Sequence, residues 1–189
     1  YKTFQPEFIK NGYTVQVLQL KDATKGNSFN PLWLPYQYYK EGKKDKTISL
    51  LQELGLELFQ SDNLNADPFW ENSAADYFTA LSLILFQEGK EEEINLGSMQ
   101  AMVSLGEKRL ENTTVIQKYF DTLEVFDPIY VAGSATVYAP SDTRGSIVSV
   151  MKQKLNNFCM REELMNNLMG HDIDFSKTKE KNVIFIIGE

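Results

Sequence analysis

Apolar and polar residues alternate over residues 13–20, directly after Gly12. β-Branched and apolar side chains at alternate positions are typical of a β-strand that is buried on one face. Residues 183–187, in contrast, form an unbroken apolar run, which is typical of a strand covered on both faces in a parallel sheet. The hydrophobic pattern therefore predicts one strand near each end of the chain.

The clearest helix signal lies between these two strands. Asp67 is a good N-cap, Pro68 suits the first helical position, and Gly89 is a natural stop, so a helix is predicted to run to about residue 87. Residues 77–86 are apolar nearly all round. We therefore expect this helix to lie at the centre of the fold.

Other stretches show helical spacing of apolar residues with weaker start signals. These helices are predicted over residues 48–60 after Thr47, from Asn95 or Ser98 to 107, from Thr113 or Thr114 to 124, over 142–158 after Ser141, and over 161–169. Prolines predict irregular structure over residues 30–39 and around Pro128 and Gly133. Residues 40–46 are predicted to form a charged, exposed linker.

Two lone strands with helices between them form an unusual arrangement, because strands need partners. The simplest interpretation is that both strands belong to a larger sheet into which about six or seven helices are inserted. The sequence thus predicts a mainly α-helical bundle, residues 33–178, inserted in an α/β protein. Residues 1–32 and 179–189 are predicted to be flanking segments of that α/β protein.

Composition narrows the function of this bundle. Of 189 residues 42% are hydrophobic, which suits a packed domain, and the net charge is -7 from 26 acidic and 19 basic residues. Proteins that bind the phosphate backbone of nucleic acids are usually basic, because Lys and Arg displace the counterions condensed on the phosphates. The charge therefore disfavours nonspecific DNA binding and favours a partner with a basic surface.

The sequence contains few residues for catalysis or metal binding. The single cysteine, Cys159, cannot form an internal disulfide, and the single histidine, His171, makes a zinc site or a Ser/His/Asp triad implausible. A phosphate-binding G-x-x-x-x-G-K-[ST] loop is absent, and no apolar run approaches the ~20 residues of a membrane-spanning helix. We therefore predict no catalytic, cofactor or metal site in this chain, and no enzyme activity of its own.

One cluster of basic and aromatic residues offers an alternative. Its members are Tyr38, Tyr39, Lys40, Lys43, Lys44 and Lys46. Lysines beside aromatic rings can bind single-stranded nucleic acid by charge and stacking. The net charge stands against this interpretation, and an exposed loop is the simpler explanation, but contact with DNA or cargo at this cluster remains a second hypothesis.

Several segments, in order, carry a family resemblance. Residues 12–32 contain Gly12, Tyr13, Val15, Asn30, Pro31 and Leu32 in a Gly-Tyr-x-Val strand that leads to Asn-Pro-Leu. Residues 67–81, 143–158 and 182–189 read DPFWENSAADYFTAL, TRGSIVSVMKQKLNNF and NVIFIIGE. Together they resemble the type IV secretion coupling proteins, the VirD4/TraG group of conjugation ATPases. A sister group, the VirB4-type secretion ATPases, shares the architecture and stays open as an alternative.

The resemblance implies a larger parent protein. Coupling proteins are membrane-anchored, hexameric, RecA-like ATPases, and an all-helical domain inserted in the motor faces the cytoplasm and receives cargo. ATP and Mg²⁺ would bind in parts of the motor before Tyr1 and after Glu189, so this chain itself would hold no cofactor. The expected partners are the relaxase or relaxosome accessory proteins, with single-stranded DNA as the alternative. In isolation the chain is expected to be a monomer or weak dimer.

Four residues are candidates for the seam between helical domain and motor: Asp67, Trp70, Glu71 and Arg144. Asp67 is also explained as a helix cap, and Trp70 as a core residue. Arg144 falls in the first turn of a predicted helix, where a cation is unfavourable against the helix dipole. We therefore expect Arg144 to have an anionic partner, either Glu71 or a neighbouring subunit.

Overall fold

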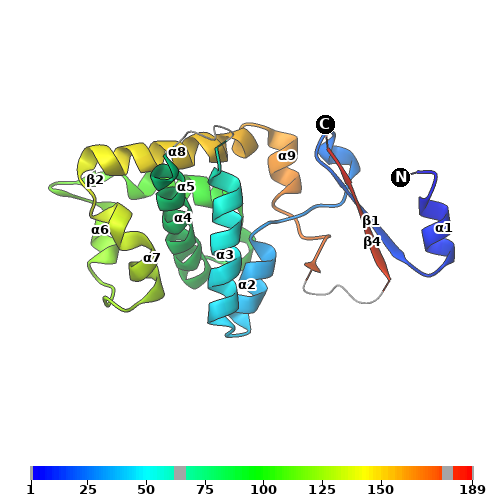
Figure 1. Cartoon of the computed structure of the whole chain (residues 1–189), viewed down its shortest axis with the longest axis horizontal. Helices are drawn as coiled ribbons and strands as arrows, with labels where there is room; N and C mark the ends of the chain where they lie inside the picture. Colours follow the sequence, from blue (N-terminus) through cyan, green and yellow to red (C-terminus); the bar gives the residue numbers. More distant parts are fainter. Residues whose placement is uncertain (1, 62–66, 176–180, 189) are drawn as a thin grey trace.

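The computed structural model of this protein describes residues 2–61, 67–175 and 181–188 (Figure 1). Within these ranges it is mainly helical, as predicted, and a pair of strands accompanied by one short helix lies at one end of the bundle. The first half contains α1 (Gln5–Lys10), β1 (Thr14–Gln19), η1 (Ala23–Lys25), α2 (Trp33–Lys40), α3 (Lys44–Phe59), α4 (Pro68–Glu88) and η2 (Glu91–Glu93). The second half contains α5 (Leu96–Gly106), β2 (Arg109–Leu110), β3 (Thr113–Thr114), α6 (Val115–Phe120), α7 (Pro128–Val137), α8 (Ser141–Cys159), α9 (Glu162–Asn167) and β4 (Asn182–Ile187).

The strands predicted near the two ends pair with each other. β1 and β4 run parallel, in a register from Thr14 opposite Asn182 to Gln19 opposite Ile187. Residues 183–187 lie in a strand, as predicted, but most of β4 is half-buried and Ile186 is 69% exposed, so the described residues do not cover this strand on both faces. Figure 1 shows α1 beside the pair on the side away from the bundle, and η1 also contacts β1.

The predicted central helix is confirmed. Every residue of α4 from Tyr77 to Phe86 is buried, and α3, α7 and α8 pack around this helix. Its start is also as predicted, since the Asp67 carboxylate accepts a hydrogen bond of 3.0 Å from the backbone N–H of Phe69. The helix ends at Glu88, and Gly89 is its C-cap. Local capping and the apolar run thus agree on the same core element.

Two segments predicted to be irregular are helices instead. α2 contains Pro35 in its first turn, and α7 begins with Pro128. Proline is tolerated at these positions because the first N–H groups of a helix have no intrahelical acceptor. Gly133 lies buried inside α7, where a Cβ atom would come within 2.5 Å of Phe120 Cζ. This glycine therefore permits close helix packing and does not break the helix.

The charged linker is shorter than predicted. α3 begins at Lys44 instead of Ile48, and Thr47 is a buried residue whose hydroxyl donates to the carbonyl of Lys43 at 3.1 Å. What remains between α2 and α3 is a tight turn in which Gly42 has a φ of +75°. Such a left-handed conformation favours glycine, which has no Cβ.

The remaining helices match the predictions in part. α5 and α8 fall within about two residues of their predicted limits. α6 and α9 are shorter, ending at Phe120 and Asn167. The N-caps of α5 and α6 are Asn95 and Thr114. The N-cap of α8 is Pro140, so Ser141 is its first helical residue and not its cap. None of the helices in the described ranges has both the length and the apolar character needed to cross a bilayer.

The two connections between the strand pair and the bundle are joined to each other. The N–H of Ser28 donates to the Asp172 carboxylate at 2.9 Å, and the N–H of Asp172 donates to the Ser28 hydroxyl at 3.1 Å. The N–H of Ile173 donates to the Ser28 carbonyl at 3.0 Å. We call residues 27–29 and 171–173 the neck. The predicted domain boundary at residue 32 lies just beyond the neck, and the boundary at residues 178–179 lies outside the described residues.

Candidate functional site

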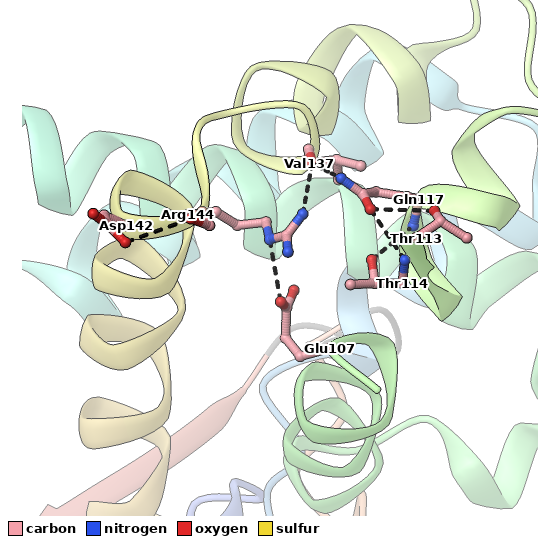
Figure 2. A network of polar contacts seen from close by, with 8 residues as sticks. Glu107, Thr113, Thr114, Gln117, Val137, Asp142 and Arg144 are labelled. Atoms are coloured by element: carbon pink, nitrogen blue, oxygen red, sulfur yellow. Dashed lines mark hydrogen bonds and ion pairs between the residues drawn. The ribbon is translucent and has the colours of Figure 1, made fainter. Parts of the chain in front are cut away.

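Arg144 has an anionic partner, as expected, but within the described residues this partner is Glu107 and not Glu71. Its Nε atom lies 3.2 Å from the carboxylate of Glu107, and both side chains are largely buried (Figure 2). Its Nη1 atom donates to the backbone carbonyl of Val137 at 3.2 Å. The expected pairing with Glu71 is therefore wrong, and the ion pair is formed within the bundle.

The location of this pair explains how α8 tolerates a cation in its first turn. Glu107 is the C-cap of α5, and Val137 is the last residue of α7. Arg144 thus reaches across to the C-terminal ends of two other helices, where carbonyl groups and helix dipoles favour a positive charge. Three helix ends are held together by one guanidinium group.

Gln117 extends the network to a fourth helix. Its amide nitrogen donates to the Val137 carbonyl at 3.1 Å, so this carbonyl accepts from both Gln117 and Arg144 (Figure 2). Its amide oxygen accepts from the N–H of Thr114 at 3.0 Å and completes the capping box of α6. An open, polar hollow of about 390 Å³ lies beside the network.

Tyr77 of α4 carries a phenol on which the charges of Glu107 and Arg144 act. Tyr77 is fully buried, and its hydroxyl has no hydrogen-bond partner within the described residues. Burial, and then the charge of Glu107, raises the pKa of this phenol, while Arg144 acts in the opposite direction. The phenol therefore stays neutral. The cluster contains no nucleophile paired with a base, and its contacts are those of a structural junction.

The other three seam candidates lie at the start of α4, away from the Arg144 network. Asp67, Trp70 and Glu71 are at the start of this helix, whereas Arg144 interacts near Tyr77, about two turns (~10 Å) further along. Trp70 is half-buried against the core, and its ring meets the exposed ring of Phe69 edge-on at 5.0 Å. The fold therefore separates the predicted seam residues into two groups.

The basic and aromatic cluster is engaged in contacts within the chain. Lys40 lies 2.7 Å from the Glu91 carboxylate and 4.7 Å from the centre of the Tyr36 ring. Lys43 lies 2.6 Å from the Glu41 carboxylate. Two of the four ammonium groups are thus paired with carboxylates on an exposed surface, which lowers the positive potential available to a phosphate backbone.

The aromatic members of the cluster are likewise occupied. The Tyr38 ring lies under Lys46 Nζ at 4.0 Å, and Lys46 also donates to the Tyr38 hydroxyl at 2.9 Å. Tyr39 packs against Phe86 at 5.7 Å, and burial followed by the charge of Glu88 raises the pKa of its phenol. Lys44 begins α3 and lines a small recess with Tyr39. A base would have to displace these contacts in order to stack.

Sequence reasoning missed two long-range contacts. The ring of His171 stacks on Trp33 with a centroid separation of 3.8 Å and an interplanar angle of 11°. Glu107 was not singled out as the partner of Arg144. Neither contact leaves a local signal, because the partners are far apart in the chain. Within the described ranges, no three His, Cys, Asp or Glu side chains come together as metal ligands would.

Comparison with known proteins gives one family. The family model for type IV secretory system conjugative DNA transfer matches residues 9–188. No curated protein and no solved structure matches the chain. The match covers both strands of the β1–β4 pair and every helix between them. The chain therefore belongs to the family of type IV secretory system conjugative DNA transfer proteins.

Proposed function

We propose that this chain is the substrate-recruitment domain of a conjugative coupling protein of the VirD4/TraG type, which receives relaxosome proteins for transfer. The observation that carries the proposal is topological. The helical bundle leaves the sheet after β1 and returns to it at β4, the adjacent parallel strand. A bundle connected in this way can be carried on a motor domain without interrupting the motor's sheet.

The strand pair supports the idea of a larger sheet. Parallel strands occur almost only in sheets that are covered on both faces, and two strands alone are marginally stable. In this chain Ile186 is 69% exposed, and apolar side chains of β4 are only half-buried. We infer that further strands and helices of a RecA-like motor domain cover this pair in the parent protein. ATP and Mg²⁺ would act in that motor, which in the family is hexameric and anchored at the cytoplasmic face of the membrane.

Charge supports a protein cargo over DNA. The chain carries a net charge of -7, and two lysines of the cluster at residues 38–46 are paired with carboxylates. Exposed ion pairs contribute little to the free energy of folding, so these two pairs would break at little cost and do not by themselves prevent DNA binding. They do reduce the number of phosphates that the surface can neutralise, and hence its affinity. DNA contact at this cluster, or a VirB4-type parent, is the competing proposal.

The test is direct binding in solution. The chain is titrated by calorimetry with the relaxase and with the accessory DNA-processing proteins encoded beside its gene, and single-stranded DNA is titrated in parallel. Binding to at least one of these proteins, with no measurable affinity for DNA at 150 mM salt (about an 8 Å screening length), supports recruitment. Binding to DNA alone, with an affinity that falls steeply as salt rises, would overturn it in favour of the DNA-contacting role.

A second measurement addresses the assembly. Because the proposed hexamer is held by the motor, light scattering of this chain should give the mass of a monomer or a weak dimer. A stable hexamer would contradict the proposal that the motor supplies the subunit contacts.

A further inference from the structure

An apolar corner protrudes at the end of the bundle furthest from the strand pair. It lies between α6 and α7, which are drawn at the opposite end of the molecule from β1 and β4 (Figure 1). Phe126 is 92% exposed, Val125 63% and Val131 64%. Single exposed apolar residues are common, but three large ones gathered at one corner indicate an interaction surface. We call these three residues the Phe126 corner.

The three residues lie around the start of α7. Asp127 is the N-cap of α7, so Phe126 precedes the cap and Val131 is the fourth helical residue. In many helices these two positions contact each other and are buried as a hydrophobic staple. Here both remain largely in solvent, so the pair does not bury itself. Its apolar area is available to a partner.

The loop that presents Phe126 is held by several hydrogen bonds. The Thr122 hydroxyl donates to the carbonyl of Tyr119 at 2.7 Å, and the N–H of Asp127 donates to the carbonyl of Glu124 at 2.9 Å. The Asp127 carboxylate accepts from the N–H of Ile129 at 2.8 Å. Because the loop is already ordered, binding to a partner would cost this loop little conformational entropy.

The segment that carries the corner is acidic. Residues 121–131 contain Asp121, Glu124 and Asp127 and no Lys, Arg or His. Glu88 at the end of α4 accepts from the hydroxyl of Tyr119 at 3.2 Å, and adds a fourth carboxylate on this side. Burial, and then the charges of Glu88 and Asp127, raises the pKa of Tyr119 to about 12. Residues 121–131 are thus net negative, and the described cations close to this segment include Lys118 in the last turn of α6 and Lys44, which lines a recess with Asp127.

We propose that the Phe126 corner is the docking surface for the protein cargo, and that the partner presents an apolar pocket rimmed by Lys or Arg. The proposal rests on the proposed recruitment function and deepens it. Phe126 would be the anchor that enters the pocket, because buried aromatic side chains dominate interface energies, and the carboxylates would face the basic rim. A second copy of this chain fits poorly, because it would bring carboxylates against carboxylates on two partners of charge -7.

The experiment compares two single variants in the same calorimetric titration with the relaxase and accessory proteins. Phe126→Ser removes the anchor, and Met160→Ser is the matched control, because Met160 is 82% exposed at the end of α8. Both changes are on the surface, and circular dichroism checks that both variants fold. We expect Phe126→Ser to raise Kd at least about tenfold and Met160→Ser to change it less than about twofold. Glu124→Gln should weaken binding mainly at low salt, through slower association.

The outcomes separate this inference from the function on which it rests. Wild-type binding that Phe126→Ser leaves unchanged would overturn the docking surface and leave recruitment intact. Wild-type chain that binds none of the proteins would overturn both. Equal weakening by Phe126→Ser and Met160→Ser would also refute a specific anchor. A mass that rises with concentration in the wild type, and not in Phe126→Ser, would assign the corner to a second copy and refute the cargo proposal.

Discussion

Arg144 and Glu107 form a largely buried ion pair, with Arg144 Nε 3.2 Å from the Glu107 carboxylate, at a point where helices α5, α7 and α8 meet. The pair links residues that are distant in the chain. The Arg144 cation is unfavourable in the first turn of α8, but its guanidinium group lies at the C-terminal ends of α5 and α7, where a positive charge is favourable. Its removal should therefore affect more than one helix.

Arg144→Ala should lower the free energy of unfolding by about 2 kcal/mol, because it leaves the Glu107 carboxylate partly buried without its cation. Urea unfolding measures this value. The double variant with Glu107→Gln should lose much less than the sum of the two single changes. The surface pair of Lys25 and Asp22 is the control, and Lys25→Ala there should change the free energy of unfolding far less than Arg144→Ala. Additive losses at Arg144 and Glu107 would contradict the coupling.

Arg144→Ala also tests whether the meeting point of α5, α7 and α8 affects the activity of the proposed motor. In the full-length parent protein, Arg144→Ala should reduce both DNA transfer and ATP turnover, because movement of α8 relative to α5 and α7 would no longer be transmitted rigidly. Transfer frequency and phosphate release measure the two activities. Unchanged values for both, in a variant that still accumulates, would show that Arg144 has a local structural role only.

Gly133 and Gly145 provide a matched pair of glycine-to-alanine changes. In Gly133→Ala the new Cβ would meet Phe120 Cζ at 2.5 Å and Ala80 Cβ at 2.8 Å, so a loss of about 1–3 kcal/mol is expected from overpacking. At Gly145, inside α8, nothing lies within 4 Å, and alanine should stabilise by about 0.5–1 kcal/mol through helix propensity. Thermal unfolding should therefore shift in opposite directions. A shift in the same direction would refute the close packing of α7 on α4.

Asp67→Ala should destabilise α4 by about 1 kcal/mol, because the Phe69 N–H loses its side-chain acceptor. Asp67→Asn keeps an acceptor at the same position and should lose only a few tenths of a kcal/mol. Chemical unfolding of both variants checks the order. If Asp67→Asn were as destabilising as Asp67→Ala, the negative charge and not the cap would be the important feature of this residue.

Asp172 makes the stability of the neck dependent on pH. The hydrogen bonds from the N–H and then the hydroxyl of Ser28 lower the pKa of the Asp172 carboxyl below its ordinary value of 3.8. The ionised carboxylate therefore stabilises the fold above about pH 4, and this contribution is lost as the pH falls through the lowered pKa. Asp172→Asn should cost about 1 kcal/mol at pH 7 and progressively less below pH 4.

Thermal unfolding of wild type and Asp172→Asn between pH 7 and pH 3 measures that difference. Ser28→Ala is the complementary variant, because it removes the hydroxyl and leaves the backbone N–H that donates to Asp172. A difference between wild type and Asp172→Asn that stays constant down to pH 3 would contradict the role of the ionised carboxylate.

Much of the fold could be predicted because its signals are local. Asp67 and Pro68 mark the start of α4, Asn95 was one of two candidates for the start of α5, and both strands were recognised from their apolar patterns. The errors arose where local rules allow two outcomes. Pro35 and Pro128 were taken as breakers, although both occupy the first turn of a helix, where proline is tolerated.

The candidate sites could be predicted only in part. That Arg144 needed an anion followed from helix electrostatics, but the identity of that anion did not. The Phe126 corner also escaped notice, because Phe126 reads as an ordinary core residue until its 92% exposure is known. Apolar character at a loop does not tell whether the side chain points into the core or into solvent.

Sequence alone determined the helical class, the N-cap of the central helix, the two strands and the family resemblance, because each depends on residues a few positions apart or on an ordered set of motifs. Tertiary structure decided that β1 pairs with β4, that Glu107 meets Arg144 and that His171 stacks on Trp33. These contacts join residues far apart in the chain. Their choice depends on how the helices pack, since packing decides which side chains come within a few ångströms of each other.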